Sequence, residues 1–332
     1  MDAPEFSFVI PTYNCAGVLQ ACLSAIRAQD YPQERVEILI VDGFSTDDTR
    51  SVAARHGAVV LDNPGVIHPA GRPIGIRAAR GELIVCLDSD NILPETAWLS
   101  KMAAPFQDPE VAAAEPMRYD ATPEESPVTR YCALIGGDDP VVVYLGFHER
   151  YSALTRSWTG VPIAETLREG WRKVTFLDPN SIPSLGANGF TVRKDVLMKV
   201  DFDPFHHINV CHRIITHVGG AWAKVDTGVI HRHGDTVKRF IEKKKRRAER
   251  RMNDQVDMGY AYPIPPWRLI WIALRSALVL PVLWDMLRGW LTRPSAVWLL
   301  HFPILYGVLF LYARTVVVRQ FRKADNEDYE KV

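Results

Sequence analysis

Short apolar runs alternate with amphipathic segments along the first third of the chain. The apolar runs cover residues 6–10, 36–41, 58–61 and 82–87, and each has the length of a strand buried on both faces. Between the first two runs, apolar residues recur at the three- and four-residue spacing of a helix. Strands that alternate with helices predict a parallel sheet with crossover helices, so we expect an α/β fold.

The pattern weakens in the middle of the chain. Residues 119–170 are rich in Pro, Gly and acidic side chains, which predicts loops and irregular segments. Regular structure is predicted again as a strand, turn and helix over residues 184–200, a helix over 207–218 and a short strand over 221–225.

The last third changes in character. Residues 238–251 carry nine Lys or Arg against two Glu, and two long apolar stretches follow at 267–291 and 296–318. A helix that spans the hydrocarbon core needs about 20 mostly apolar residues, and both stretches are long enough. They are interrupted by charged residues, so we consider three arrangements: a membrane hairpin turning at residues 292–295, amphipathic helices in the interface, or an ordinary soluble helical subdomain.

Tryptophans favour the membrane arrangements, because amphipathic rings settle at the membrane boundary. These tryptophans are Trp267, Trp271, Trp284, Trp290 and Trp298. The chain therefore divides into an expected catalytic domain at residues 1–235, a basic and helical juxtamembrane segment at 236–262 and a hydrophobic membrane-associated region with a charged tail at 263–332.

Composition narrows the possible partners and the compartment. Among 332 residues, 39 Lys or Arg balance 39 Asp or Glu, so net charge does not indicate a nucleic-acid partner. The five cysteines have no CxxC spacing, which argues for a reducing compartment. The basic segment also indicates a cytoplasmic face, so we expect the globular part on the cytoplasmic side of the cell membrane.

Carboxylates follow the fourth apolar run as Asp88-Ser89-Asp90. The first and second runs also end in polar residues, at Thr12 and Asp42, and ligands of an α/β sheet bind at the carboxyl ends of the strands. Residues two apart on a strand lie on one face, roughly 6 to 7 Å apart. One carboxylate could bind a divalent cation such as Mg²⁺ or Mn²⁺ while the other holds a sugar hydroxyl or a metal-bound water. Such a triplet can also simply cap a following helix.

The segments "VIPTYNCAGVLQACLSAIRAQDYPQERVEILIVDGFSTDDT" and "ARGELIVCLDSDN" resemble the opening half of the family 2 glycosyltransferases. The resemblance is close over residues 6–115 and looser to about residue 235. It implies the GT-A fold, a Rossmann-like nucleotide-binding sheet with helices on both faces.

The same resemblance implies the donor site. The nucleotide-sugar contacts that it implies are Pro11, Thr12, Tyr13, Asp42, Arg72, Asp88 and Ser89. Asp90 is the expected direct ligand of a divalent metal, with Asp88 beside it, and His231 and His233 are either further ligands or surface histidines. An Asp at position 42 favours a UDP-sugar as the donor.

The acidic pair that serves as general base in many family members is missing. His206 and His207 stand at its place, and Asn209 occupies a nearby position. Either His207 is the base, since its unperturbed pKa near about 6.5 suits proton removal at neutral pH, or the nucleophile is an ionised phosphate that needs no base. Asn188 and Arg193 are candidates for acceptor-side contacts, or else serve the local turn and helix start.

We therefore expect an inverting, metal-dependent glycosyltransferase that acts on a membrane lipid-linked acceptor. The acceptor would be polyprenyl phosphate or a polyprenyl-diphosphate-linked saccharide in the assembly of cell-envelope glycans or glycolipids. Two alternatives remain open: a polysaccharide or protein glycosyltransferase anchored by its tail, and a catalytically silent protein that binds nucleotide sugars. The sequence does not determine the oligomeric state.

Overall fold

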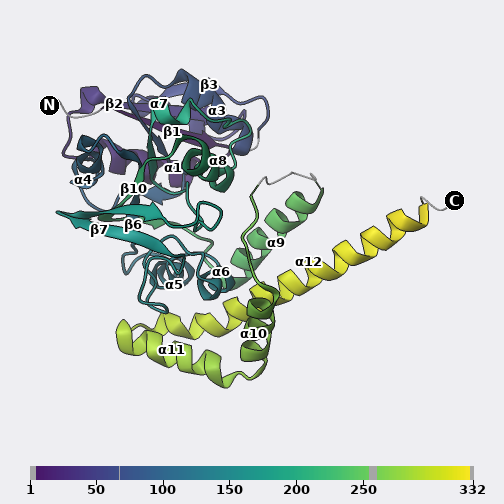
Figure 1. Ribbon diagram of the computed structural model, residues 1–332. Helices are drawn as coiled ribbons and strands as arrows, with labels where there is room; N and C mark the ends of the chain where they lie inside the picture. The colour runs from purple at the N-terminus through teal and green to yellow at the C-terminus, as the bar shows by residue number, and fades with distance from the viewer. Residues whose placement is uncertain (1–4, 67, 254–259, 330–332) are drawn as a thin grey trace.

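The core of the molecule is a ten-stranded mixed β-sheet in this computed structural model (Figure 1). The structure describes residues 5–66, 68–253 and 260–329. The strands follow the order β3-β2-β1-β4-β9-β6-β10-β8-β7, and β5 pairs with β10. Their bounds are β1 Phe6–Thr12, β2 Val36–Asp42, β3 Val59–Asp62, β4 Leu83–Cys86, β5 Asn91–Ile92, β6 Val111–Tyr119, β7 Ile163–Arg168, β8 Trp171–Phe176, β9 Phe190–Arg193 and β10 Ala221–His231.

The first four strands form the parallel sheet that the apolar runs predict. β1 pairs in parallel with β2 and β4, and β2 pairs in parallel with β3. The register of β1 and β2 places Thr12 opposite Asp42, so the polar ends of these strands meet. β3 differs from the expectation of a fully buried strand: its residues are exposed or half-buried, because it is an edge strand of the sheet.

Helices cover both faces of this sheet, as the resemblance to the GT-A fold predicts. Residues of α1, α2 and α4 share one hydrophobic cluster with Phe8 and Ile10, whereas α3, α7 and α8 contribute to a second cluster with Val9. The bounds of these helices are α1 Ala16–Arg27, α2 Thr49–Arg55, α3 His68–Ala78, α4 Trp98–Ala103, α7 Lys194–Leu197 and α8 His207–Arg213. α8 continues into a π-helical turn, so the helix predicted at residues 207–218 is present.

The strand predicted at residues 221–225 is longer in the structure. β10 runs parallel to β6 and antiparallel to β8, and it continues to His231, which pairs with Asn91 of β5. A register shift between Val225 and Gly228 interrupts the apolar alternation. This irregularity conceals the second half of the strand in the sequence pattern.

Two helices lie in the segment where loops were predicted. α5 covers Pro127–Ile135 and α6 covers Pro140–Leu145. The side chain of Ser126 accepts a hydrogen bond from the first turn of α5, and Asp139 does the same for α6. Both helices are too short to produce a clear helical period, and tertiary packing stabilises them.

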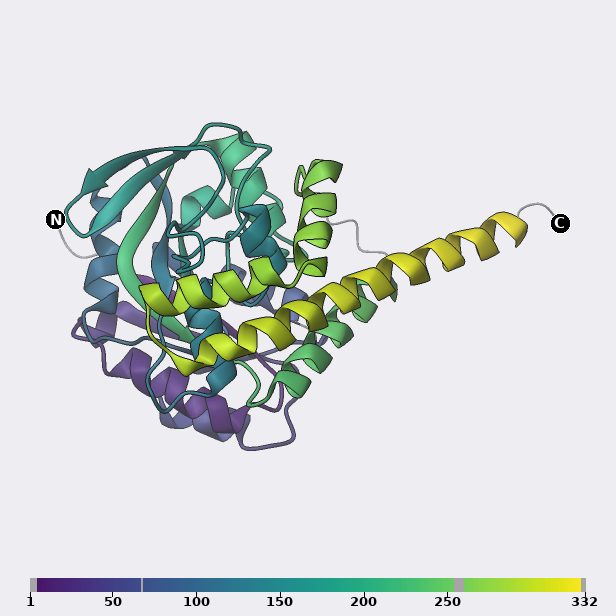
Figure 2. The ribbon, with the colours of Figure 1, turned by 90° about the horizontal axis from the view of Figure 1, so that it is seen from below.

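The C-terminal helices pack onto α5 and α6. They are α9 Val237–Asn253, α10 Pro266–Ala277, α11 Leu280–Thr292 and α12 His301–Tyr329. Figure 2, which is seen from below, shows α11 and α12 side by side in front of the sheet. Tyr131 of α5, Phe240 of α9 and Trp298 before α12 belong to one hydrophobic cluster. The expected units 1–235 and 263–332 therefore share a core.

The apolar stretches do not form two straight antiparallel spans among the described residues. Ala296–Thr315 is long and apolar enough to cross a membrane, but 39% of its most apolar window is buried inside the protein. The stretch at 267–291 is instead broken into α10 and α11, which meet at an angle of 87°.

Candidate active site

The two carboxylates that follow β4 have different cationic partners. Nη2 of Arg72 in α3 donates a 2.6 Å hydrogen bond to Oδ1 of Asp88. The Arg72 guanidinium is buried and lies over the ring of Phe205 at 5.4 Å, so aromatic packing holds it in place. Arg72 therefore balances the charge of Asp88 from within the protein.

Asp90 is paired with His231 by the sheet itself. The antiparallel pairing of β5 with β10 sets His231 opposite Asn91, and the backbone N–H of Arg232 donates to the carbonyl of Asp90 at 2.9 Å. As a result, Nε2 of His231 lies 3.5 Å from Oδ1 of Asp90. Burial alone would raise the pKa of Asp90 and lower that of His231, but their mutual attraction outweighs burial and reverses both shifts.

A lysine from the basic helix also reaches this acid. Nζ of Lys243 in α9 lies 3.6 Å from Oδ2 of Asp90. The adjacent Lys244 contacts Asp138 at 3.2 Å and Asp139 at 3.4 Å. The basic segment is expected at the membrane surface, whereas in the structure these two lysines contact acids of the preceding part of the chain.

His233 lies beside His231 without touching Asp90 among the described contacts. The two imidazole rings are 4.2 Å apart between centroids, and His233 also packs against Phe240 of α9. Burial lowers the pKa of His233 well below its ordinary value, and the positive charge of His231 lowers it further. His233 is half-buried, with its ring against those of His231 and Phe240.

The nucleotide-side residues lie where β1 and β2 end. Asp42 is fully buried, and its carboxylate accepts hydrogen bonds from Thr12 Oγ1 at 2.9 Å, from Ser45 and from Nε of Arg50 at 2.8 Å. Burial opposes ionisation, but these hydrogen bonds lower the pKa of Asp42. Tyr13 is 55% exposed, so it can stack on a ligand, whereas Asp42 mainly organises the loop.

The remaining donor-side predictions fall at the same edge of the sheet. Pro11 is buried, opposite Val41 in the register of β1 and β2. Ser89 is half-buried between the two acids and reaches the thiol of Cys15 with its hydroxyl. The structure thus brings together the predicted donor residues of three strand ends.

The predicted base region lies at the start of α8. His207 is half-buried, and its Cβ is close to Gly186, where an added Cβ would lie only 3.0 Å away. Phe205, just before the helix, holds Arg72. Asn209 is buried, and within the described part of the chain no hydrogen bond reaches its Oδ1. Through Phe205 and Arg72, this helix start adjoins the Asp88 side of the site.

Arg193 is not part of this group of residues. β9 runs antiparallel to β4, so Arg193 pairs with Leu83 at the start of β4, and Asp88 follows the other end of that strand. Its guanidinium donates to the backbone carbonyls of Val111, Phe106 and Asp108. In this structure Arg193 therefore has a structural role at the end of the strands opposite to Asp88.

A buried polar network that the sequence did not indicate lies behind the site. The carboxylate of Glu115 accepts from Arg150 at 3.0 Å and from Lys224 at 3.1 Å, and all three side chains are fully buried. Burial raises the pKa of Glu149 to about 7 and lowers that of Lys224 to about 7. The hydroxyl of Tyr119 donates to Glu149 at 3.1 Å.

Asn188 belongs to this network. Its Nδ2 donates to the Tyr119 hydroxyl at 2.8 Å. Asn188 has a positive φ of +50°, as have Gly186 and Gly189 in the same turn. The ring of Tyr119 lies 6.2 Å from that of His231. Asn188 is 6% exposed, so here it supports Tyr119 and His231 from behind.

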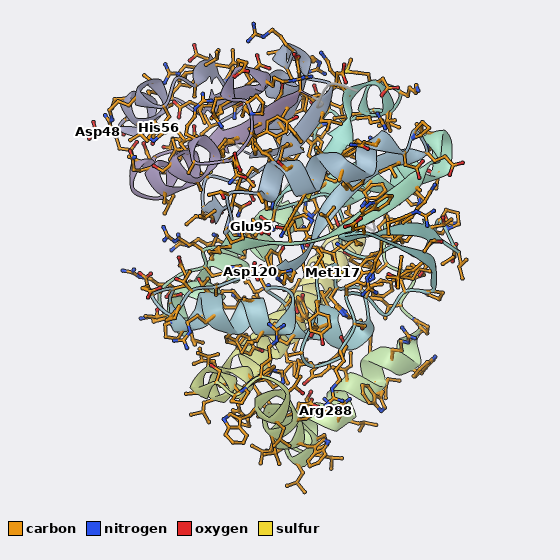
Figure 3. The ribbon with its side chains drawn as sticks, turned by 90° about the vertical axis from the view of Figure 1, so that its left-hand side faces the viewer. Asp48, His56, Glu95, Met117, Asp120 and Arg288 are labelled. Carbon is orange, nitrogen blue, oxygen red and sulfur yellow. The ribbon has the colours of Figure 1, made fainter. Side chains whose placement is uncertain are left out.

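The site occupies the middle of the molecule. Asp120 follows β6, and its backbone N–H donates to the carbonyl of Val229 in β10, two residues before His231. Glu95 lies three residues after β5 and accepts a hydrogen bond from Thr227 of β10. Figure 3 shows Asp120 and Glu95 between the N-terminal half, marked by Asp48, and the C-terminal helices, marked by Arg288. Helices of the last third can therefore reach the site.

The donor atoms of Asp90 and His231 suit a divalent cation. A carboxylate oxygen and an imidazole nitrogen are ligands that Mn²⁺ accepts, and Mg²⁺ would rely more on the oxygen. Among the described residues no three His, Cys, Asp or Glu side chains form one metal-binding group. Two protein ligands leave coordination positions for diphosphate oxygens and water.

Comparison with known proteins fits this geometry. Residues 7–161 match the Glycosyl transferase family 2 model. This part of the chain, a little less than half of its length, is similar to the family 2 glycosyltransferases. The glycosyltransferase AglE of Haloferax volcanii is 34% identical over 105 residues, which cover 30% of this chain and 34% of that protein. A PGL/p-HBAD biosynthesis glycosyltransferase of Mycobacterium bovis is 35% identical over 112 residues, which cover 31% of this chain and 42% of that protein.

The matched residues span less than half the length of each of these two relatives. A solved structure, the mannosyltransferase PcManGT from Pyrobaculum calidifontis in complex with GDP-Man and Mn²⁺, is 16% identical. It aligns with a TM-score of 0.54 over 95% of this chain and 88% of that chain. This likeness supports the GT-A-like α/β fold expected for the family 2 domain.

Proposed function

We propose that this protein is an inverting, metal-dependent glycosyltransferase that moves a sugar from a nucleotide sugar to a lipid-linked acceptor. The observation that carries the proposal is the pair of carboxylates after β4, of which Asp88 is held by Arg72 and Asp90 lies beside His231. In a family 2 domain these residues stand at the carboxyl ends of the strands, where a nucleotide sugar binds.

The chemistry of the site agrees with transfer from a nucleoside diphosphate. Asp90 and His231 would hold the metal ion, which when bound stabilises the negative charge that develops on the leaving diphosphate. Arg72 lies beside Asp88 and can fix the orientation of that carboxylate toward the donor. Tyr13 is exposed at the end of β1 and can cover the nucleotide base. UDP is the donor nucleotide that we favour.

The exposed surface of α10 and α11 supports a membrane-bound acceptor. We call it the aromatic surface, and its members are Trp267, Leu269, Ile270, Trp271, Leu274, Leu278, Leu280, Leu283, Trp284, Leu287, Trp290 and Leu291, each more than a third exposed. Tryptophan and leucine side chains in such a continuous band insert at the boundary between headgroups and acyl chains.

The geometry of these helices favours insertion into one leaflet over a complete crossing by α10 and α11. The 87° bend between them prevents a single straight span. Arg275 of α10 pairs with Asp285 of α11 at 2.6 Å, and both side chains are mostly buried against the protein. Their charges are thus satisfied on the inner face of the bent pair. Most exposed side chains of the two helices are apolar, and Arg288 is an exposed charge beside them. We propose that this surface holds the catalytic part on the cytoplasmic face.

Part of the basic segment is also available to anionic lipid headgroups. Lys238 and Arg246 are exposed on α9, whereas Lys243 and Lys244 contact acids of the catalytic part. Exposed basic residues beside a membrane gain about 1 kcal/mol each from anionic lipids. A phosphate-bearing acceptor would share this attraction.

The acceptor decides whether a base is needed. A polyprenyl phosphate attacks with an oxygen that is already ionised, and the absence of an acidic pair at His206 and His207 is consistent with that nucleophile. A polyprenyl-diphosphate-linked saccharide attacks with a hydroxyl, and His207 at the start of α8 is then the expected base. In either case an in-line displacement inverts the anomeric carbon.

A donor and acceptor screen tests the proposal. The full chain in detergent with Mn²⁺ or Mg²⁺ is given UDP-sugars and GDP-mannose, with polyprenyl phosphate as the acceptor, and released nucleoside diphosphate and lipid product are measured together. Glycosylated polyprenyl phosphate supports the proposal and identifies the sugar. Release that requires a lipid-linked saccharide makes a hydroxyl the nucleophile.

Two other outcomes would favour different functions. Label that enters water-soluble polymer or protein instead of extractable lipid indicates a glycosyltransferase that uses its tail only as an anchor. Nucleotide-sugar binding without turnover on any acceptor indicates a catalytically silent binding protein.

A further inference from the structure

We propose that Lys243 is a donor-binding residue, whose ammonium group binds the diphosphate of the nucleotide sugar beside Asp90. This inference rests on the proposed function and adds a residue from outside the family 2 domain, since the match ends at residue 161. It assigns one face of the basic helix α9 to the donor site.

The position of Lys243 is the first argument. Its Nζ lies 3.6 Å from Oδ2 of Asp90, and His231 lies on the other oxygen, Oδ1. A diphosphate that shares a metal ion with Asp90 must lie within a few ångströms of this carboxylate, which is within reach of a lysine that already contacts it. Lysine is a common phosphate ligand because its ammonium is a compact charge with three donors.

The anchoring of α9 is the second argument. Lys244 is mostly buried and pairs with Asp138 and Asp139, which lie in the turn between α5 and α6. Ile241, three residues before Lys244 on α9, packs so closely on Gly307 of α12 that an added Cβ at Gly307 would lie 2.8 Å from it. These contacts hold the helix against the catalytic part, so the direction of Lys243 toward Asp90 does not depend on one flexible side chain alone.

The side chain of Lys243 is free to serve a ligand, which is the third argument. It is 44% exposed, whereas that of Lys244 is 13% exposed. An exposed lysine 3.6 Å from one carboxylate contributes little to folding stability. Its four-carbon stem also allows Nζ to shift from the carboxylate to a phosphate oxygen without moving the helix.

The alternative role for Lys243 is that of a simple counter-ion to Asp90, and the two roles predict opposite results. A counter-ion competes with the metal, so its removal would leave nucleotide binding with saturating metal unchanged or stronger. A diphosphate ligand cooperates with the metal, so its removal would weaken binding of UDP. UMP lacks the second phosphate and should be less affected.

The test uses the full chain in detergent and the variants Lys243→Met, Lys243→Arg and Lys245→Met. Lys245 lies on the same helix, is exposed and pairs only weakly with Glu249 at 3.9 Å, so it is the matched control. Binding of UDP and UMP is measured by calorimetry at saturating Mn²⁺, and Mn²⁺ binding alone by electron paramagnetic resonance. GDP replaces UDP if wild type binds only GDP.

We expect Lys243→Met to weaken UDP binding roughly tenfold or more, with less than about a threefold effect on UMP. Lys243→Arg should retain most of the affinity, Lys245→Met should match wild type, and Mn²⁺ binding without nucleotide should not weaken. Equal UDP affinity of wild type and Lys243→Met overturns this inference and leaves the proposed function standing. Failure of wild type to bind any nucleoside diphosphate overturns both.

Discussion

Nε2 of His231 lies 3.5 Å from Oδ1 of Asp90, and this contact gives Asp90 a partner that the neighbouring Asp88 does not share. Asp88 is balanced by Arg72 of α3, whereas Asp90 is balanced by His231 of β10 and Lys243 of α9. Two like charges this close would repel each other if they shared one environment. The fold instead supplies each carboxylate with its own cation.

Replacing Asp90 by Asn should reduce sugar transfer by at least about 10²-fold, because the amide cannot supply the anionic oxygen that a metal ion needs. His231→Ala should weaken Mn²⁺ binding by about tenfold or more, since one of two protein ligands is lost. His217→Ala, a surface histidine, is the control. Transfer by Asp90→Asn at a tenth of the wild-type rate or above would sink the assignment of this site.

His207→Ala distinguishes the two nucleophiles. If the acceptor is a hydroxyl, loss of the base should lower kcat by about 10²-fold and remove the acidic limb of the pH–rate profile. If the acceptor is an ionised phosphate, the rate should change by less than about threefold. The neighbouring His206→Ala serves as the control for damage to α8. A large loss in both variants would point to a structural effect and contradict a specific role of His207.

Glu149→Gln should change the pH dependence of stability. Burial raises the pKa of Glu149 to about 7 from its ordinary 4.5, so the folded state binds this proton more tightly than the unfolded chain does. The stabilisation that this proton provides is complete below about pH 4.5 and is lost as the pH rises to about 7. Relative to Glu149→Gln, wild type should therefore lose on the order of 3 kcal/mol across this window.

Denaturant unfolding of both proteins at several pH values measures this difference, and effects of groups that do not interact with Glu149 cancel in the comparison. The exposed Glu169→Gln is the control and should show no such difference from wild type. Parallel stability curves for wild type and Glu149→Gln would show that Glu149 is ionised in the fold.

Replacing Trp271 and Trp284 together by Ser should weaken binding to vesicles, because both rings belong to the aromatic surface and are 49% and 58% exposed. Flotation with vesicles of neutral and anionic lipid measures the bound fraction. The pair Leu167→Ser and Leu177→Ser, exposed on the β7–β8 hairpin, is the matched control. Unchanged flotation of the double tryptophan variant would refute a membrane role for this surface.

Deleting residues from 267 onward should destabilise the catalytic part as well as release it from membranes. Val282, Trp298 and Ile304 are buried in the cluster that also contains Tyr131 of α5. Their removal exposes apolar surface on α5 and α6, at a cost of about 25 cal/mol per Å². A lower Tm and increased proteolysis between residues 127 and 145 are expected. A truncated chain as stable as the full one would contradict a shared core.

Local patterns in the sequence predicted the nucleotide-binding half well. The apolar runs correspond to β1–β4, and the helical spacing before Val36 corresponds to α1, because buried strands and amphipathic helices leave regular periods. Asp88 and Asp90 were identifiable because charged residues directly after a buried run are unusual. α5, α6 and the end of β10 were missed, since short helices and an interrupted strand leave no such period.

What the sequence by itself determined is therefore the parallel α/β core, the carboxylates at its edge and the resemblance to family 2 glycosyltransferases. Only the tertiary structure decided which cation lies beside which carboxylate, and that Lys243 faces Asp90. It also decided that Arg193 lies at the end of the strands opposite to Asp88, and that Glu149 is buried behind Tyr119. The physical reason is that these relationships join residues far apart in the chain. They depend on the register of β5 with β10 and on the packing of α9, for which neighbouring residues in the sequence carry no signal.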